Sequence, residues 1–158
     1  MFREVARKKN ALSREDGIEL LKTTLRGVLS VQGDDGYPYG MPINHWYNEE
    51  DGCLYFHGGR IGHKIDSIRR CDKASFCAFN DGVRKEGDWA LTIRSVIVFG
   101  RVGFVEDREE AIRISRKLCE KFPDSLPEME EEIRRSGGAV LCFRLTPEHI
   151  TAKQIREA

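Results

Sequence analysis

The sequence carries no net charge and no long apolar run. Its 158 residues include 26 basic and 26 acidic side chains, so the formal charges cancel. A neutral chain produces no overall field that would attract nucleic acid or an anionic membrane surface. No segment approaches the ~20 apolar residues of a membrane-spanning helix. We therefore expect no nucleic-acid partner and no membrane partner, and any anion site has to be local.

Cysteine is scarce and follows no pairing pattern. The five cysteines are an odd number, and no two of them form a C-x-x-C pair. This usage is typical of reduced thiols in a reducing compartment. The charged start Met1-Phe2-Arg3-Glu4 also lacks the apolar segment of a signal peptide. The sequence therefore predicts a cytoplasmic protein, folded as one domain over residues 1–158.

The common catalytic and metal-binding motifs are absent as well. No serine lies in a G-x-S-x-G elbow, and the glycines from Gly58 to Gly62 fit neither the P-loop nor the dinucleotide fingerprint. His45, His57 and His63 lie on three separate predicted elements without the spacing of a zinc site. A serine hydrolase, an ATP or NAD site and a metal centre are therefore not predicted.

The most informative segment that is present begins as a short apolar strand at Leu54. The strand breaks at Gly58-Gly59, and a helix follows whose apolar positions Ile61, Ile65 and Ile68 have the spacing i, i+4, i+7. The pattern predicts a strand, a glycine turn and a short amphipathic helix.

Basic residues and a glycine surround the predicted start of this helix: Arg60, Gly62, His63 and Lys64. Unpaired backbone N–H groups and the positive end of the helix dipole favour an anion there, and a bare glycine lets a phosphate approach the main chain. The segment therefore predicts a phosphate-binding turn. The alternative is an ordinary strand-to-helix junction, which needs glycines in any case, with solvated basic side chains.

The strand predicted from Tyr37 to Tyr47 contains two prolines. Pro38 and Pro42 remove hydrogen-bond donors on the same side of the backbone, which is typical of an edge or interrupted strand. Such a strand leaves main-chain groups free to bond a planar heterocycle, and Asn44 adds a side-chain amide. An ordinary edge strand with its aromatic residues facing the core explains the pattern equally well.

Two further positions have chemical potential. Ser95 follows Arg94 at the one polar break in a long apolar strand, where a hydroxyl beside a guanidinium suits a phosphate; an outward-facing polar pair is the alternative. His57 ends a strand beside glycines, and its imidazole is able to exchange a proton near pH 7. The alternative for His57 is a hydrogen bond to the Gly58-Gly59 turn.

The remaining patterns predict a mainly β protein with flanking helices. A capping box at Ser13 starts a helix that ends near Thr24, and a second capping box at Asp107 starts another helix. Strands joined mainly by hairpins indicate a small antiparallel barrel. The strand predicted from Trp89 to Val105 is apolar on both faces at Val96 to Phe99, which suggests one face in the barrel and the other in a subunit contact.

Two shorter elements complete this prediction. Pro127 to Arg135 has the pattern of a short helix, and Gly137-Gly138 that of a turn before the last strand.

Four ordered motifs resemble the nitroimidazole-resistance flavoproteins of the pyridoxamine-phosphate-oxidase-like superfamily. The motifs are Gly36-Tyr37-Pro38-Tyr39-Gly40-Met41-Pro42-Ile43-Asn44, Leu54-Tyr55-Phe56-His57-Gly58, Gly62-His63-Lys64-Ile65-Asp66 and Arg94-Ser95-Val96-Ile97-Val98-Phe99-Gly100-Arg101. The resemblance covers essentially the whole chain. It implies a six-stranded antiparallel split β-barrel that forms a homodimer with FMN at the subunit interface.

The resemblance also implies roles for individual residues. Gly62, His63 and Lys64, with Arg60, would hold the FMN phosphate, and Ser95 would approach it from the long strand. The isoalloxazine ring would be lined by the interrupted strand and a neighbouring strand at Pro42, Ile43, Asn44, His45 and Phe56.

The function implied is that of an FMN-dependent oxidoreductase, of nitroreductase type, which passes electrons to a small-molecule acceptor. His57 is the candidate catalytic residue, as a proton donor beside the flavin. The alternative is a non-enzymatic flavin- or haem-binding protein in which His57 or His149 ligates iron. The chain ends at Ala158 without the C-terminal segment by which pyridoxamine-phosphate oxidases hold pyridoxal phosphate, so we do not expect vitamin B6 oxidation. The sequence names neither the electron donor nor the physiological substrate.

Overall fold

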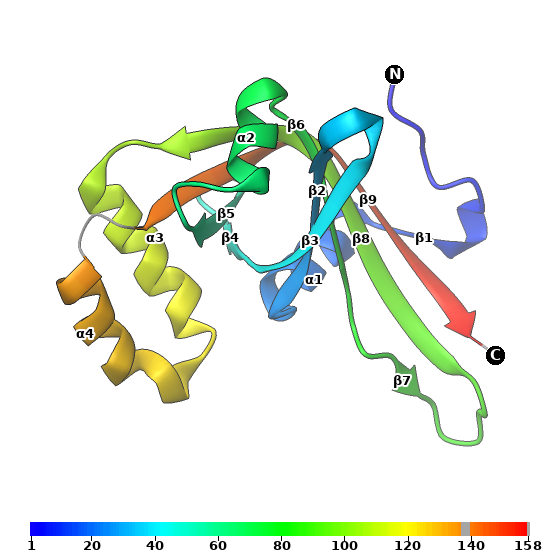
Figure 1. Ribbon diagram of the computed structural model, residues 1–158. Helices are drawn as coiled ribbons and strands as arrows, with labels where there is room; N and C mark the ends of the chain where they lie inside the picture. The colour runs from blue at the N-terminus through cyan, green and yellow to red at the C-terminus, as the bar shows by residue number, and fades with distance from the viewer. Residues whose placement is uncertain (137–139, 158) are drawn as a thin grey trace.

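The computed structural model describes residues 1–136 and 140–157; the predicted turn at Gly137-Gly138 lies outside them. Its helices and strands run in the following order (Figure 1): η1 (Lys8–Asn10), β1 (Ala11–Leu12), α1 (Arg14–Thr23), β2 (Arg26–Gln32), η2 (Asp34–Gly36), β3 (Pro38–Asn44), β4 (Trp46–Asn48), β5 (Cys53–Gly58), α2 (His63–Arg70), β6 (Lys73–Phe79), β7 (Val83–Arg84), β8 (Leu91–Val105), α3 (Arg108–Glu120), η3 (Pro123–Ser125), α4 (Leu126–Ser136) and β9 (Leu141–Glu157). No helix among these residues is long and apolar enough to cross a membrane.

All strands belong to one antiparallel sheet in the order β3-β2-β6-β8-β9-β5-β4, with β1 paired to β9 and β7 to β8. The two ends of this order, β3 and β4, are separated in the chain by His45 alone. The two edges of the sheet therefore meet at His45, and β3 also contacts β5.

The barrel predicted from the sequence is confirmed, with a small difference in the number of strands. The described residues form nine separate strands. Six long strands remain when β3 and β4 are counted as one bent strand and the two-residue strands β1 and β7 are left aside. The break at His45 is the physical reason for the difference.

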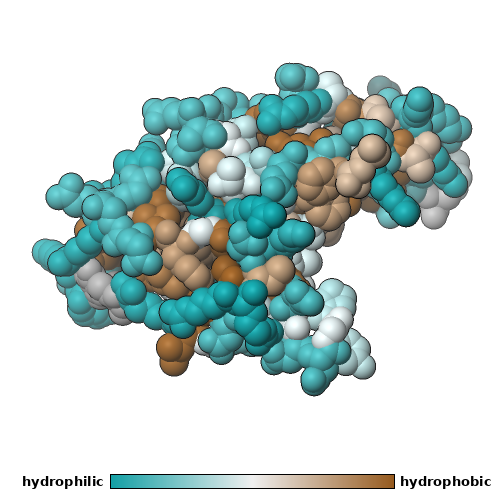
Figure 2. Space-filling model, turned by 90° about the horizontal axis from the view of Figure 1, so that it is seen from above, coloured by the Kyte–Doolittle hydropathy of each residue, from teal (hydrophilic) through white to brown (hydrophobic). Residues whose placement is uncertain are grey.

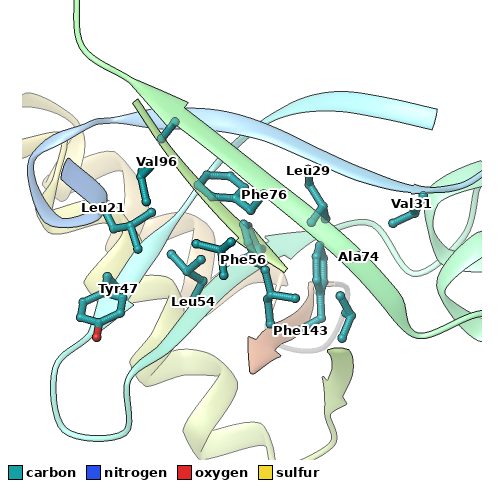
Figure 3. Packing of buried hydrophobic residues seen from close by; sticks show 14 of the residues in the cluster. Leu21, Leu29, Val31, Tyr47, Leu54, Phe56, Ala74, Phe76, Val96 and Phe143 are labelled. Atoms are coloured by element: carbon teal, nitrogen blue, oxygen red, sulfur yellow. The ribbon is translucent and has the colours of Figure 1, made fainter. Parts of the chain in front are cut away.

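The inside of the barrel is filled by alternate residues of its strands. Leu54 and Phe56 of β5, Phe76 of β6 and Phe143 of β9 have no exposed surface, and Figure 3 shows their side chains pointing toward one another. The Phe56 ring lies 5.3 Å from the Phe143 ring and 5.5 Å from the Phe76 ring, measured between centroids. These contacts fix the register of the strands, because a slip of one residue would turn each side chain to the opposite face.

The apolar run at Val96 to Phe99 divides between the two faces of β8. Val96 and Val98 are fully buried in the barrel, as expected. On the outer face, Phe99 is 39% exposed and is partly covered by Phe2, whose ring centroid lies 5.7 Å away. The inward half of the prediction is confirmed, and the subunit contact on the outer face stays a prediction.

Helices cover the outside of one part of the barrel. Helix α3 packs on β5 and β9 through a second apolar cluster that includes Tyr55, Ile114, Leu118 and Cys142, and α4 packs against α3 (Figure 1). Helix α1 begins at the predicted capping box, in which the Ser13 side chain accepts a hydrogen bond from the N–H of Asp16.

The predicted start of α2 is wrong by two residues. Ile61, expected on the apolar face of the helix, is 90% exposed and precedes it. Gly62 has φ +119° and forms the N-cap, a conformation that residues other than glycine rarely adopt. The chain therefore turns sharply at Gly62, and helical spacing does not extend back to Ile61.

Candidate functional site

The N-terminus of α2 presents free backbone donors. Gly62 provides no capping side chain, and its carbonyl accepts from the N–H groups of Ile65 and Asp66. Among the residues that the structure describes, no acceptor is bonded to the N–H groups of His63 and Lys64. Figure 2 looks onto the face that carries α2 and shows apolar atoms between hydrophilic ones. The free N–H groups at this helix end can bind an anion.

The Lys64 side chain lies beside these donors and is half-buried. Its ammonium is 5.2 Å from the centroid of the Phe143 ring, and a Cβ added at Gly58 would lie only 2.7 Å from it. In the described part of the chain, Lys64 has neither a carboxylate nor a hydrogen-bond acceptor as a partner. Burial lowers the pKa of Lys64. A bound anion would offset this cost, because a partly buried charge is stabilised by pairing.

His57 lies at the end of β5, next to Gly58. Burial lowers the pKa of His57, and the nearby charge of Lys64 lowers it further, so the imidazole is neutral at pH 7. The structure gives the ring no hydrogen-bond partner within residues 1–136 and 140–157, including the Gly58-Gly59 turn. The ring nitrogens of His57 are therefore available to a ligand.

The His63 ring is engaged with the β2–β3 hairpin. It stacks on Tyr39 with the ring centroids 4.1 Å apart, and its Nε2 lies 3.4 Å from the Asp34 carboxylate, which also pairs with Arg70 at 2.7 Å. These contacts fix α2 against the hairpin. The part of His63 that remains free for an anion is its backbone N–H.

From this contact, β3 leads away along the edge of the sheet. Pro38 and Pro42 are accommodated because β3 pairs only with β2, which confirms the predicted edge strand. Backbone N–H groups alternate in direction, so those of Gly40 and Asn44 point to the same outer side as the proline nitrogens. Tyr39 and Asn44 are five residues apart, roughly 17 Å along a strand. Within the described residues, the edge of β3 thus presents backbone groups that no other strand pairs, and these groups begin at the contact with α2 and extend away from it.

Two residues assigned to the cofactor from the sequence do not reach a ligand with their side chains. His45 and Phe56 have no exposed surface. The Nε2 of His45 donates a hydrogen bond to the carbonyl of Leu21 at 2.7 Å, and Phe56 packs in the barrel interior. Both lie beside candidate site residues in the sequence but point into the core.

Arg60 and Ser95 have surroundings different from those of Lys64. Arg60 lines a cavity against α3 with Val105 and Asp107. Ser95 lies far along the sheet from the end of β5. His57 of β5 and Val105 of β8 are both paired to Cys142 of β9, so these two residues mark the same level of the sheet. Ser95 precedes Val105 by ten residues, which corresponds to about 30 Å of strand. A single chain therefore does not bring Ser95 to the Lys64 site. The family resemblance had implied that both residues contact the same phosphate.

The buried imidazole of His45 predicts that the protein loses stability in acid. Burial, together with the charge of Lys121, lowers the pKa of His45 to about 3, whereas the unfolded side chain has a pKa near 6.5. The unfolded state therefore takes up the proton first as the pH falls. The contribution of neutral His45 to stability is therefore fully present above about pH 6.5 and is lost progressively as the pH falls from about 6.5 to 3.

Urea unfolding of the parent and of His45→Gln, measured from pH 7 to pH 4, tests this expectation. We expect the variant to be less stable at pH 7 but to show a shallower decrease in unfolding free energy toward pH 4. Parallel curves for the two proteins would contradict the assignment of the acid sensitivity to His45.

No group of three or more metal-binding side chains is present in the described residues. The candidate site thus consists of the α2 N-terminus, Lys64, His57 and the edge of β3. It combines an anion-binding end with free backbone groups and a neutral imidazole.

A family model described as pyridoxamine 5'-phosphate oxidase matches residues 13–154. No curated protein sequence matches the chain. Among solved structures, a candidate 5-nitroimidazole antibiotic resistance protein from Bacteroides thetaiotaomicron is similar, with 19% identity and a TM-score of 0.74 over 93% of this chain and 87% of that one.

Two other solved structures are similar in fold. The flavocytochrome Anf3 from Azotobacter vinelandii has 19% identity and a TM-score of 0.75 over 94% of this chain and 71% of that one. An FAD-binding protein from Mesorhizobium loti has 20% identity and a TM-score of 0.66 over 92% and 96%. At this level of identity the similarity establishes the fold.

Proposed function

Because the chain belongs to the pyridoxamine 5'-phosphate oxidase family, we propose that it is an FMN-dependent oxidoreductase. The N-terminus of α2 and Lys64 would hold the FMN phosphate, and the edge of β3 at Pro42, Ile43 and Asn44 would line the isoalloxazine ring. The observation that carries this proposal is the half-buried Lys64 ammonium, which has no acidic partner in the described residues, together with the free N–H groups of His63 and Lys64 at the start of the same helix.

Each part of the site has a defined task. The N–H groups of His63 and Lys64 bind phosphate oxygens, and the Lys64 charge adds a charge-assisted hydrogen bond. Backbone groups of β3 orient the ring, and bound flavin supplies the electron-transfer chemistry. His57 holds or releases a proton within reach of the substrate side, with a pKa that burial has lowered. The substrate would be a small-molecule electron acceptor, and a nitroaromatic compound is our first candidate.

We further propose that the protein is a homodimer with FMN at the subunit interface. A contribution of Ser95 to the phosphate site requires this arrangement, because Ser95 and Lys64 of one chain lie at distant parts of the sheet. The exposed outer-face residue Phe99 supports β8 as part of the contact.

Purification tests these proposals directly. A yellow protein whose released cofactor co-elutes with FMN, and which sediments as a dimer, is the expected result. A red protein with a Soret band would instead favour the haem-binding alternative. For that alternative, the ring of His149 is stacked on Phe2 at 5.1 Å between centroids, so His57, whose ring has no hydrogen-bond partner in the described residues, is the better candidate for the iron ligand. A monomer with full flavin occupancy would contradict the interface site.

His57→Gln tests the proposed proton donor. The variant should keep FMN but react at least tenfold more slowly with a nitroaromatic acceptor, which is the low side of the effect of a general acid. Since a donor with a lowered pKa is protonated mainly in acid, the parent rate should rise below neutral pH and the variant rate should not. Anaerobic stopped-flow reoxidation across pH measures both. An unchanged rate and pH profile would leave His57 without a catalytic role.

A further inference from the structure

A lysine of α3 holds the bend between β3 and β4. Lys121 is the C-cap residue of α3, and its ammonium donates hydrogen bonds to the carbonyl of Thr24 at 2.6 Å and to the carbonyl of His45 at 2.7 Å. Thr24 directly follows α1, and His45 is the residue between the two strands. One ammonium therefore connects three segments that are far apart in the sequence.

The side chain of His45 anchors the same bend from the other side. Its Nε2 donates to the carbonyl of Leu21 near the end of α1 at 2.7 Å, and its ring lies 4.7 Å from the Phe76 ring centroid. A carbonyl and a side chain of one residue are thus held by two different partners. This leaves little freedom for the backbone at His45.

The sheet alone does not provide this restraint. β3 is an edge strand, bonded only to β2, and its pairing ends at Asn44 with Arg26. β4 pairs with β5, starting from Trp46. Between them, His45 belongs to neither ladder, so its position depends on the contacts from Lys121 and Leu21.

We propose that Lys121 is a positioning residue for the flavin ring. By holding the His45 carbonyl, it sets the direction of Pro42, Ile43 and Asn44, the segment that lies along the ring in the proposed function, on which this inference rests. In this proposal Lys121 does not touch the ligand. It acts through the backbone of His45, the residue that directly follows Asn44.

The electrostatics agree with a positional role. Burial lowers the pKa of Lys121 to about 8, so the charge is held at a cost. A methionine would fill a similar volume without that cost but would leave two carbonyls unbonded. A buried charge need not add net stability, and in this proposal Lys121 is retained for the geometry of the bend.

The test compares Lys121→Met with Leu118→Ala in the full-length protein. Leu118 belongs to α3, and its side chain packs in the apolar cluster with Tyr55. Its truncation should destabilise α3 without removing the two hydrogen bonds of Lys121. We expect Lys121→Met to weaken FMN and riboflavin equally, by about tenfold, because fewer molecules present the binding geometry. Leu118→Ala should bind both flavins like the parent at temperatures where it is folded.

Hydrogen exchange of the flavin-free proteins provides a second measurement. We expect faster exchange at Asn44, His45 and Trp46 in Lys121→Met and not in Leu118→Ala. If Lys121→Met does not fold, Lys121→Gln, which retains an amide donor, should show the same effects to a smaller degree.

Three results would overturn the inference: parent-like binding of both flavins by the folded lysine variant, equal weakening in Leu118→Ala, or unchanged exchange at the bend. A parent protein that binds neither flavin would refute the proposed function instead. The exchange comparison would then still decide whether Lys121 holds the bend.

Discussion

Replacing Lys64 with alanine is expected to weaken FMN binding ten- to hundredfold and to change riboflavin binding far less. The two ligands differ only in the phosphate, and Lys64 lies in the first turn of α2, whose N-terminal N–H groups are free within the described residues. One charge-assisted hydrogen bond contributes about 1.5 to 3 kcal/mol, which corresponds to this factor. Isothermal titration of the cofactor-free protein with each flavin measures the difference.

Arg60→Ala is the matched control for this experiment. It removes a positive charge four residues earlier, but Arg60 lines a cavity on the side of α3. Its FMN affinity should therefore stay close to that of the parent. Equal weakening of FMN and riboflavin in Lys64→Ala would show that Lys64 acts through folding, and a large loss in Arg60→Ala would place the phosphate in a different part of the loop.

Replacing Gly100 with alanine is expected to destabilise the protein by about 3 kcal/mol or more, the upper range for overpacking a core. A Cβ at Gly100 would lie 2.1 Å from the carbonyl oxygen of Thr146. That position belongs to the backbone of β9, at the irregularity in register between Phe99 and Gly100. The longest strand pair of the barrel would have to separate locally.

Gly103→Ala is the control, because it lies on the same strand and nothing is within 4 Å of its added Cβ. Its unfolding free energy should remain within about 1 kcal/mol of the parent value, since only backbone preference changes. Urea unfolding of the three proteins measures both differences. Similar stability of the two alanine variants would contradict the close packing at Gly100.

Several features were predictable because they depend on local chemistry. Ser13 and Asp107 cap helices through their own side chains. Pro38 and Pro42 exclude a central strand whatever the rest of the fold, because proline cannot donate to a second neighbour. In each case the feature depends on an interaction between residues at most a few positions apart in the chain, or on the backbone of the residue itself.

The local structure around the candidate site was predictable, whereas the roles of its residues stay predictions. The glycine turn and Lys64 adjoin the start of α2, as the pattern indicated. The family resemblance placed His45 and Phe56 at the ligand. Their burial results from strand alternation and from the bend, which turn them into the core.

Lys121 had no signal in the sequence, since a basic residue at the end of a helix is ordinarily a solvated one. Its partners Thr24 and His45 are 97 and 76 residues away. The sequence by itself determined the periodicities, the caps, the edge strand and the family. Only the tertiary structure decided which side chains share a site, because the pairing of β5 with β9 and β8 brings His57 near Val105 and leaves Ser95 about 30 Å away along the strand. Distances of this kind arise from the register of strands far apart in the chain, and local residue patterns do not encode them.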